Sequence, residues 1–169
     1  MIGAFVEGLR ANDCEVTGPV AVEDARRLLV HYARGTVALN ADVPIAGLAD
    51  DLDDVLLPDA PDWRARLPDA AIGITGARIA VVDPPTIALA AAPGSPRATS
   101  LIPPVHVCVV PVGDVVPTLG DALARLTAEE LPSALTWIGG PSRTGDLEMI
   151  LTLGVHGPRR VEVVLIAPD

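Results

Sequence analysis

The chain has 169 residues, which is long enough for one domain with its own hydrophobic core, and its formal net charge is −10. This acidic balance disfavours binding to nucleic acid or to an anionic membrane, because both depend on clustered positive charge. No apolar run approaches the ~20 residues that span a bilayer, and residues 1–7 lack the pattern of a secretory signal. We therefore expect a cytoplasmic protein that makes no contact with a membrane.

The composition limits both the core and the chemistry. Half of the residues are hydrophobic, yet only two Trp, one Tyr and one Phe are present. The core must be filled mainly by aliphatic side chains, which suits close-packed strands covered by helices and favours an α/β fold. The sequence contains arginine but no lysine, which excludes Schiff-base and P-loop lysine chemistry.

The two cysteines, Cys14 and Cys108, belong to no Cys-x-x-Cys pair. A usual structural zinc or iron–sulfur site takes four ligands, so we expect no metal and no cofactor in this chain. Cys108 lies within a Val-rich run, where a small buried hydrophobe is the favoured interpretation.

The N-terminal part contains fewer strong signals. We predict a helix that starts after Thr17-Gly18-Pro19 and runs to about Arg34, followed by a short strand at residues 36–39. The acidic segment 50–54 is interpreted as a solvated helix face, because it lacks the ligand spacing of a calcium loop. The turn-rich segment 58–68 is predicted to be an internal connection.

The C-terminal part shows a clearer alternation of strands and helices. A capping box at Thr118 and Asp121 predicts a crossover helix, and residues 145–154 are predicted to form a second. The predicted strands are residues 70–74, 79–82, 87–91, 105–110, 134–138 and 161–166. We therefore predict a mostly parallel sheet with helices on both faces, in a single domain over 1–169 whose segment 1–69 is a less specific, helical portion.

Ligands of such sheets bind beyond the carboxyl ends of the strands, so the loops after Ile74, Val110 and Ile138 are the places to search. After Ile138, a glycine-rich turn leads into the helix predicted at Gly145. Its free backbone N–H groups, with the guanidinium of Arg143, predict an anion site. The alternative is that Thr144 caps the helix, Arg143 pairs with Asp146 or Glu148, and the glycines relieve tight packing. The candidate ligand-binding residues are Thr75, Gly76, Gly140, Ser142, Arg143, Thr144, Gly145 and Asp146.

The histidines have two open interpretations. His156 is expected at the C-terminal end of that helix, where it would bind the last carbonyl groups, or it would serve as a general acid or base. His106 begins a buried strand, and a hydrogen-bonded core histidine is the favoured interpretation. Asp83 and His156 are the candidates for moving a proton if the chain is an enzyme, which the sequence leaves open.

Three stretches carry a family resemblance. Residues 140–148 with 153–158, residues 73–77 and residues 100–107 closely resemble, in order and spacing, the signature of LUD-domain proteins of the lactate utilization protein C family. The resemblance covers residues 70–169. It implies a fold like the NagB, ribose-5-phosphate isomerase and CoA-transferase group.

The resemblance also implies a role in the oxidation of L-lactate to pyruvate. It implies an accessory component that binds a small carboxylate, a phosphate or partner subunits, and the partners would be iron–sulfur proteins. The alternative is an enzyme that acts on a phosphorylated or acyl, CoA-type molecule held by Arg143 and the helix at Gly145.

One segment departs from the family pattern. Family members usually have Glu-Thr-Gly-Thr where this chain has Asp83-Pro84-Pro85-Thr86. The tight glycine turn is therefore lost there, and two prolines remove backbone donors that could contact a ligand.

Overall fold

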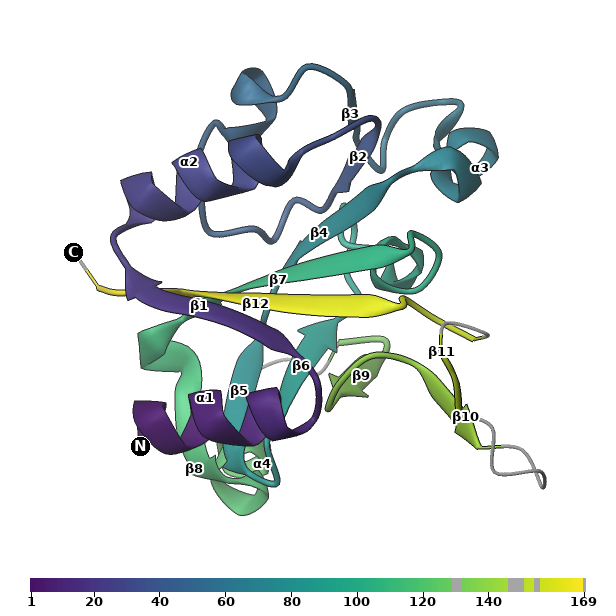
Figure 1. The fold of residues 1–169 in the computed structure, drawn as a ribbon. Coiled ribbons are helices and arrows are strands. Elements are labelled where there is room, and N and C mark those ends of the chain that lie inside the picture. Colours follow the sequence, from purple (N-terminus) through teal and green to yellow (C-terminus); the bar gives the residue numbers. More distant parts are fainter. Residues whose placement is uncertain (129–131, 146–150, 154–155, 169) are drawn as a thin grey trace.

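The computed structural model describes residues 1–128, 132–145, 151–153 and 156–168. Its centre is a six-stranded sheet in which every pair of neighbouring strands is parallel (Figure 1). The strands, in spatial order, are β1 (Glu15–Val20), β12 (Arg160–Ile166), β7 (Val105–Pro111), β4 (Ile72–Gly76), β2 (Val37–Leu39) and β3 (Val55–Leu56). The predicted mostly parallel sheet is confirmed.

One face of this sheet is covered by α2 (Val22–Tyr32), as Figure 1 shows. The helix buries Ala25 and Leu29 against aliphatic side chains of the central strands, such as Ile74 and Val109. Valine and isoleucine dominate these strands because β-branched side chains pack well on a pleated surface that is buried on both sides.

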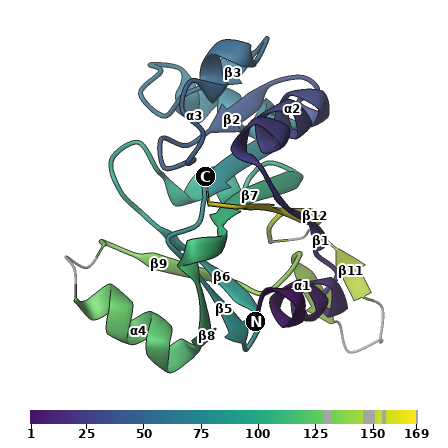
Figure 2. The same ribbon diagram turned by 90° about the vertical axis from the view of Figure 1, so that its left-hand side faces the viewer.

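The other face is covered by α1 (Ile2–Ala11) and a second sheet. Phe5 and Leu9 of α1 pack with Cys108, Val163 and residues of the second sheet in one core cluster. The second sheet has the strand order β8 (Val115–Thr118), β5 (Ile79–Asp83), β6 (Thr86–Ala90) and β9 (Leu135–Ile138). Its outer face is covered by α4 (Leu119–Thr127), as Figure 2 shows. Helices therefore lie on both faces of the parallel sheet, as predicted.

The remaining elements are short. The helix α3 (Trp63–Arg66) and the 3₁₀ helices η1 (Leu48–Asp51), η2 (Leu67–Asp69), η3 (Arg97–Ser100) and η4 (Val112–Asp114) connect the strands. A separate two-stranded hairpin is formed by β10 (Arg143–Gly145) and β11 (Leu151–Leu153). No helix in the described ranges is long and apolar enough to cross a bilayer.

Several local predictions are confirmed. The side chain of Thr118 accepts a hydrogen bond from the backbone of Asp121, and the Asp121 side chain accepts one from the backbone of Thr118. This capping box starts α4 as predicted. Cys108 is fully buried in the core.

The N-terminal part contributes more strands than the sequence predicts. The structure adds α1, β1 and β3, and Thr17-Gly18-Pro19 lies within β1, before the helix α2 begins at Val22. Pro19 can occupy this strand because β1 is at the edge of the sheet, where one side of the backbone has no strand partner. Segment 1–69 is therefore not only helical.

Two predictions for the C-terminal part are wrong. The strand at residues 134–138 is not in the parallel sheet, because β9 pairs antiparallel with β6 in the second sheet. The helix predicted over 145–154 is also wrong where the structure describes it, since Gly145 pairs with Leu151 between β10 and β11. Alternating Leu-Thr-Leu in β11 has the two-residue period of a strand, and β-branched residues favour that state.

Candidate functional site

A cavity of about 710 Å³ opens beyond the carboxyl ends of β2 and β4. This is the edge where parallel α/β sheets ordinarily bind ligands. Its walls come from the loop after β2, the turn between β4 and β5, and the segments that flank β6 and β9. The polar residues that line it are Asp42, Arg78, Ser95 and Ser133.

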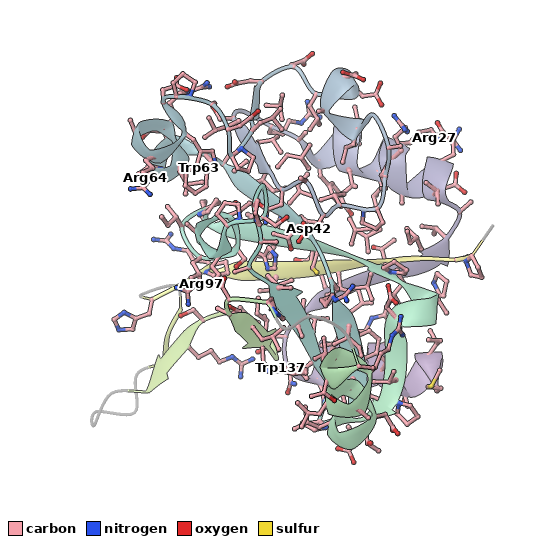
Figure 3. The ribbon with its side chains drawn as sticks, turned by 180° about the vertical axis from the view of Figure 1, so that it is seen from behind. Arg27, Asp42, Trp63, Arg64, Arg97 and Trp137 are labelled. Atoms are coloured by element: carbon pink, nitrogen blue, oxygen red, sulfur yellow. The ribbon has the colours of Figure 1, made fainter. Side chains whose placement is uncertain are left out.

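Asp42 is the best-anchored polar group of this cavity, and Figure 3 labels it near the centre of the molecule. Its carboxylate accepts a hydrogen bond from the backbone N–H of Gly76 at 3.0 Å, and others from the Ser95 hydroxyl and its own backbone N–H. Partial burial of the carboxyl group raises its pKa, while these hydrogen bonds act in the opposite direction. The site thus holds one oriented carboxyl group whose pKa is raised.

Gly76 allows Asp42 to approach the sheet. A Cβ atom at position 76 would lie 2.1 Å from the backbone oxygen of Asp42, a separation that no side chain tolerates. The absence of a side chain is therefore what brings the loop after β2 onto the end of β4. Thr75 and Gly76, both predicted as ligand-binding residues, lie at this end of β4.

A buried polar pair lies behind the cavity. The hydroxyl of Thr75 and Nε2 of His106 are 2.9 Å apart, and both residues are fully buried. Burial lowers the pKa of His106 to about 4, because the charged imidazolium is disfavoured away from water. His106 is therefore neutral at physiological pH, and its predicted role as a hydrogen-bonded core histidine is confirmed.

Other buried polar atoms lie around η3. Within the described residues, Nδ1 of His106, Oδ1 of Asn40 and Oγ1 of Thr99 have no hydrogen-bond partner. The amide of Asn40 donates to the backbone oxygen of Pro96, which directly follows Ser95 of the cavity wall. Buried polar atoms ordinarily have hydrogen-bond partners. These three atoms, on the inner side of segment 95–100, can therefore each form a further hydrogen bond.

The predicted residues after β9 lie elsewhere. Arg143 forms an ion pair with Asp13, and the backbone N–H of Ser142 donates to the backbone oxygen of Pro158 at 3.0 Å. A Cβ atom at Gly140 would lie 2.5 Å from the backbone oxygen of Asn12. Tight packing at this glycine matches the alternative interpretation, whereas the observed partner of Arg143 is Asp13, and the expected partners Asp146 and Glu148 are outside the described residues. Thr144 and Gly145 lie in β10, and Asp146 is outside the described residues.

The strand β9 separates these two groups of predicted residues. Leu135, at its start, pairs with Ala90 on the cavity wall, whereas Ile138, at its end, pairs with Ile87. Gly140 and the hairpin follow from that second end. The structure therefore does not bring Thr75 and Gly76 together with Arg143.

Asp83 ends β5 at a tight turn. β5 and β6 pair antiparallel up to Val81 and Thr86, and Pro84 and Pro85 form the turn beyond them. Two prolines thus form a tight turn where the family pattern has a glycine turn, because the fixed φ of proline suits turn positions. Asp83 itself is exposed and does not line the large cavity.

His156 occupies an exposed bend between β11 and β12. Its predicted position at a helix C-terminus is wrong, because the preceding described residues, Leu151–Leu153, form a strand. Neither Asp83 nor His156 lines the cavity that contains Asp42.

Asp42 and Ser95 are the site residues that the sequence analysis missed. A signal for Asp42 was present, because it follows the predicted strand at 36–39 by three residues. Placing that strand next to β4 would have put Asp42 at the carboxyl edge. Ser95 carried no comparable signal, since it lies in a long loop whose path the sequence does not determine.

Comparisons with known proteins agree with this architecture. A sequence profile of the LUD domain matches residues 58–166. The chain belongs to the LUD-domain family. A relative called lactate utilization protein C from Deinococcus radiodurans is 35% identical over 158 residues, which cover 90% of this chain and 69% of the relative. A protein of the same name from an Exiguobacterium species is 35% identical over 157 residues, which cover 86% of this chain and 67% of the relative.

The fold of this LUD-domain chain also matches a solved structure. A crystal structure of a DUF162 family protein from Deinococcus radiodurans superimposes with a TM-score of 0.70 at 27% sequence identity. The match covers 98% of this chain and 95% of the other. The two-sheet LUD-domain architecture therefore includes the N-terminal strands that precede the profile match.

Proposed function

We propose that this LUD-domain protein is an accessory component of an L-lactate utilization system and binds a small anionic ligand in the cavity beside Asp42. The relatives called lactate utilization protein C support the assignment to a lactate utilization system. The carboxyl group of Asp42, anchored by Gly76 and Ser95 at the carboxyl edge of a parallel sheet, carries the proposed site.

The chemistry of the lining suits a small carboxylate. Arg78 brings a guanidinium to the wall, and guanidinium groups bind carboxylates and phosphates through paired hydrogen bonds. The oriented carboxylate of Asp42 can accept a hydrogen bond from the 2-hydroxyl group of a bound 2-hydroxy acid. Lactate presents a carboxylate and a 2-hydroxyl group, and pyruvate presents a carboxylate and a 2-keto oxygen.

The size of the cavity favours a second candidate. About 710 Å³ exceeds what a three-carbon acid fills, so a phosphorylated or acyl, CoA-type molecule also fits. In that case the protein would be an enzyme, with Asp42 as the group placed to move a proton.

We also propose that iron–sulfur proteins act as partners. Cys14 and Cys108 are both buried, and burial raises their pKa values to about 11 and about 12, respectively. Thiols held in the protonated form are poor metal ligands. Electron transfer from lactate would therefore use clusters bound by other subunits.

Thermal unfolding with a panel of lactate, pyruvate, sugar phosphates and CoA esters tests the site. A ligand at about 100 times its dissociation constant should stabilise the fold by roughly 2.7 kcal/mol, which corresponds to an increase in Tm of about 5–10 °C for a chain of this size. We expect Asp42→Ala and Ser95→Ala to lose most of this increase and Arg143→Ala to keep it.

The variants also discriminate the alternatives. Loss of the response in Arg143→Ala with retention in Asp42→Ala would move the ligand to the segment of Gly140, Ser142 and Arg143. A response to phosphates or CoA esters alone, with turnover seen by NMR of that ligand, would favour the enzyme. No response to any compound would reject the cavity as the site.

A further inference from the structure

A second hollow of about 640 Å³ lies between α3 and η3. It is lined by Trp63, Arg64, Leu67, Arg97, Leu101 and Ile102, among others. The elements that form it directly precede β4 and β7 in the chain. Its lining residues differ from those of the cavity beside Asp42, and we call it the α3–η3 groove.

Two features of the α3–η3 groove are typical of a protein-binding surface. Leu101 and Ile102 are adjacent in sequence and exposed by 42% and 48%, respectively. Trp63 is partly buried against Leu67 and Ala98, which leaves an aromatic side chain in the wall. Interfaces are enriched in such aromatic and arginine side chains and depleted in acidic ones.

The charges of the groove select the partner. In the part of the chain that the structure describes, the guanidinium groups of Arg64 and Arg97 form no hydrogen bond and no ion pair, and no carboxylate lines the groove. Other surface arginines, such as Arg26 and Arg125, pair with aspartates. Two uncompensated guanidinium groups in a protein of net charge −10 make this groove complementary to acidic groups.

We propose that the α3–η3 groove docks a partner-protein segment that combines acidic and apolar side chains. The apolar side chains would cover Leu101 and Ile102, and the carboxylates would pair with Arg64 and Arg97. Figure 3 shows Trp63, Arg64 and Arg97 on the same flank of the molecule. This inference rests on the proposed role of the chain as a component that works with other proteins.

The groove and the ligand cavity share one chain segment. Pro93 and Ser95 line the cavity, and Pro96 and Arg97 line the groove. A docked segment would contact the residues next to Ser95, the residue that holds Asp42, without covering the cavity. Partner binding and ligand binding are thus compatible in the same molecule.

The two tryptophans supply a direct test by NMR. Indole N–H signals of Trp63 and Trp137 can be assigned with Trp137→Phe, and Trp137 lines a different hollow. The probe is a short synthetic peptide of leucine and glutamate, and its control has lysine in place of glutamate. We expect the acidic peptide to shift the Trp63 signal only, and the lysine peptide to shift neither.

Charge reversal tests the arginines. We expect Arg64→Glu and Arg97→Glu each to lower the affinity for the acidic peptide at least about tenfold. High salt should lower the affinity of the wild type for the same peptide. Arg27→Glu is the matched control, because Arg27 is exposed on α2 at the opposite side of the view in Figure 3. Melting curves of all variants show whether each is folded.

Three outcomes would overturn the docking surface. They are no Trp63 shift with the acidic peptide, an equal shift with the lysine peptide, and the same shift with pyrophosphate alone, which would indicate a small-anion site. A Trp63 shift that depends on protein concentration alone would instead assign the groove to a second copy. The response of Asp42 variants to small ligands is independent of these results, so failure of either proposal is recognisable.

Discussion

Replacing Gly76 by alanine should lower the free energy of unfolding by about 2–3 kcal/mol, a typical cost of overpacking. The new methyl group would lie 2.1 Å from the backbone oxygen of Asp42, so the loop after β2 must move away from β4. Urea unfolding monitored by tryptophan fluorescence measures the loss. Ligand-induced stabilisation should disappear in the same variant, because Asp42 would lose the N–H of Gly76 as a donor.

Gly3→Ala is the matched control for this substitution. Gly3 lies in α1, and a Cβ atom built there meets no other atom within 4 Å. We expect this variant to be unchanged or more stable by up to about 1 kcal/mol, since alanine is a better helix former. Equal stability of Gly76→Ala and wild type would show that the loop does not pack on β4 as described.

The buried histidine should make stability fall in mild acid. The pKa of His106 in the folded protein is about 4, below the ordinary value of 6.5. Below pH 6.5 the imidazole of His106 binds a proton in the unfolded chain but stays neutral in the folded chain. The free energy of unfolding therefore decreases as the pH falls from 6.5 to 4. The full contribution corresponds to about 3 kcal/mol.

The change in stability between pH 7 and pH 4.5 in wild type and His106→Gln measures this contribution. Glutamine can hydrogen bond to Thr75 but does not titrate, so the variant should lose less stability on acidification. Burial raises the pKa values of Asp42 and Glu162, and these carboxyl groups act in the opposite direction in both proteins. His31→Gln, at an exposed position of α2, should behave like wild type. Identical acid sensitivity in wild type and His106→Gln would contradict a buried neutral imidazole.

The parts of the fold that were predictable carry local signals. The run at residues 105–110 is apolar except for His106 and forms β7, the third strand of the sheet, and the capping residues Thr118 and Asp121 satisfy each other within one turn of α4. Such signals act over a few residues and do not depend on the rest of the fold. The contact between Thr75 and His106 is not of this kind, because it joins two strands whose register places His106 opposite Gly73, two residues before Thr75.

The parts that were not predictable depend on distant partners. Residues 134–138 have the pattern of a strand, but whether that strand joins the parallel sheet or β6 is decided by tertiary packing. The helix predicted at Gly145 was placed after a glycine-rich turn, yet pairing between Arg143–Gly145 and Leu151–Leu153 overrides that local preference.

The same distinction applies to the candidate site. Thr75 and Gly76 could be named because the carboxyl ends of parallel strands are where ligands bind. Asp42 and Ser95 are far apart in sequence and meet only because Gly76 leaves room for the loop after β2. Arg143 was predicted to bind the same ligand, but it follows the end of β9 that lies away from the cavity.

The order of strands has a practical consequence for any shortened version of the protein. The LUD-domain match begins at residue 58, yet β1, β2 and β3 all precede it and form both margins of the parallel sheet. A fragment cut at the start of the match would keep β12, β7 and β4. It would lack β1, the neighbour of β12, and β2, the neighbour of β4. The backbone N–H and C=O groups of β12 and β4 would then lack strand partners, and fragments would pair with one another through these edges. The start of the LUD-domain match is therefore not a position at which this chain can be cut.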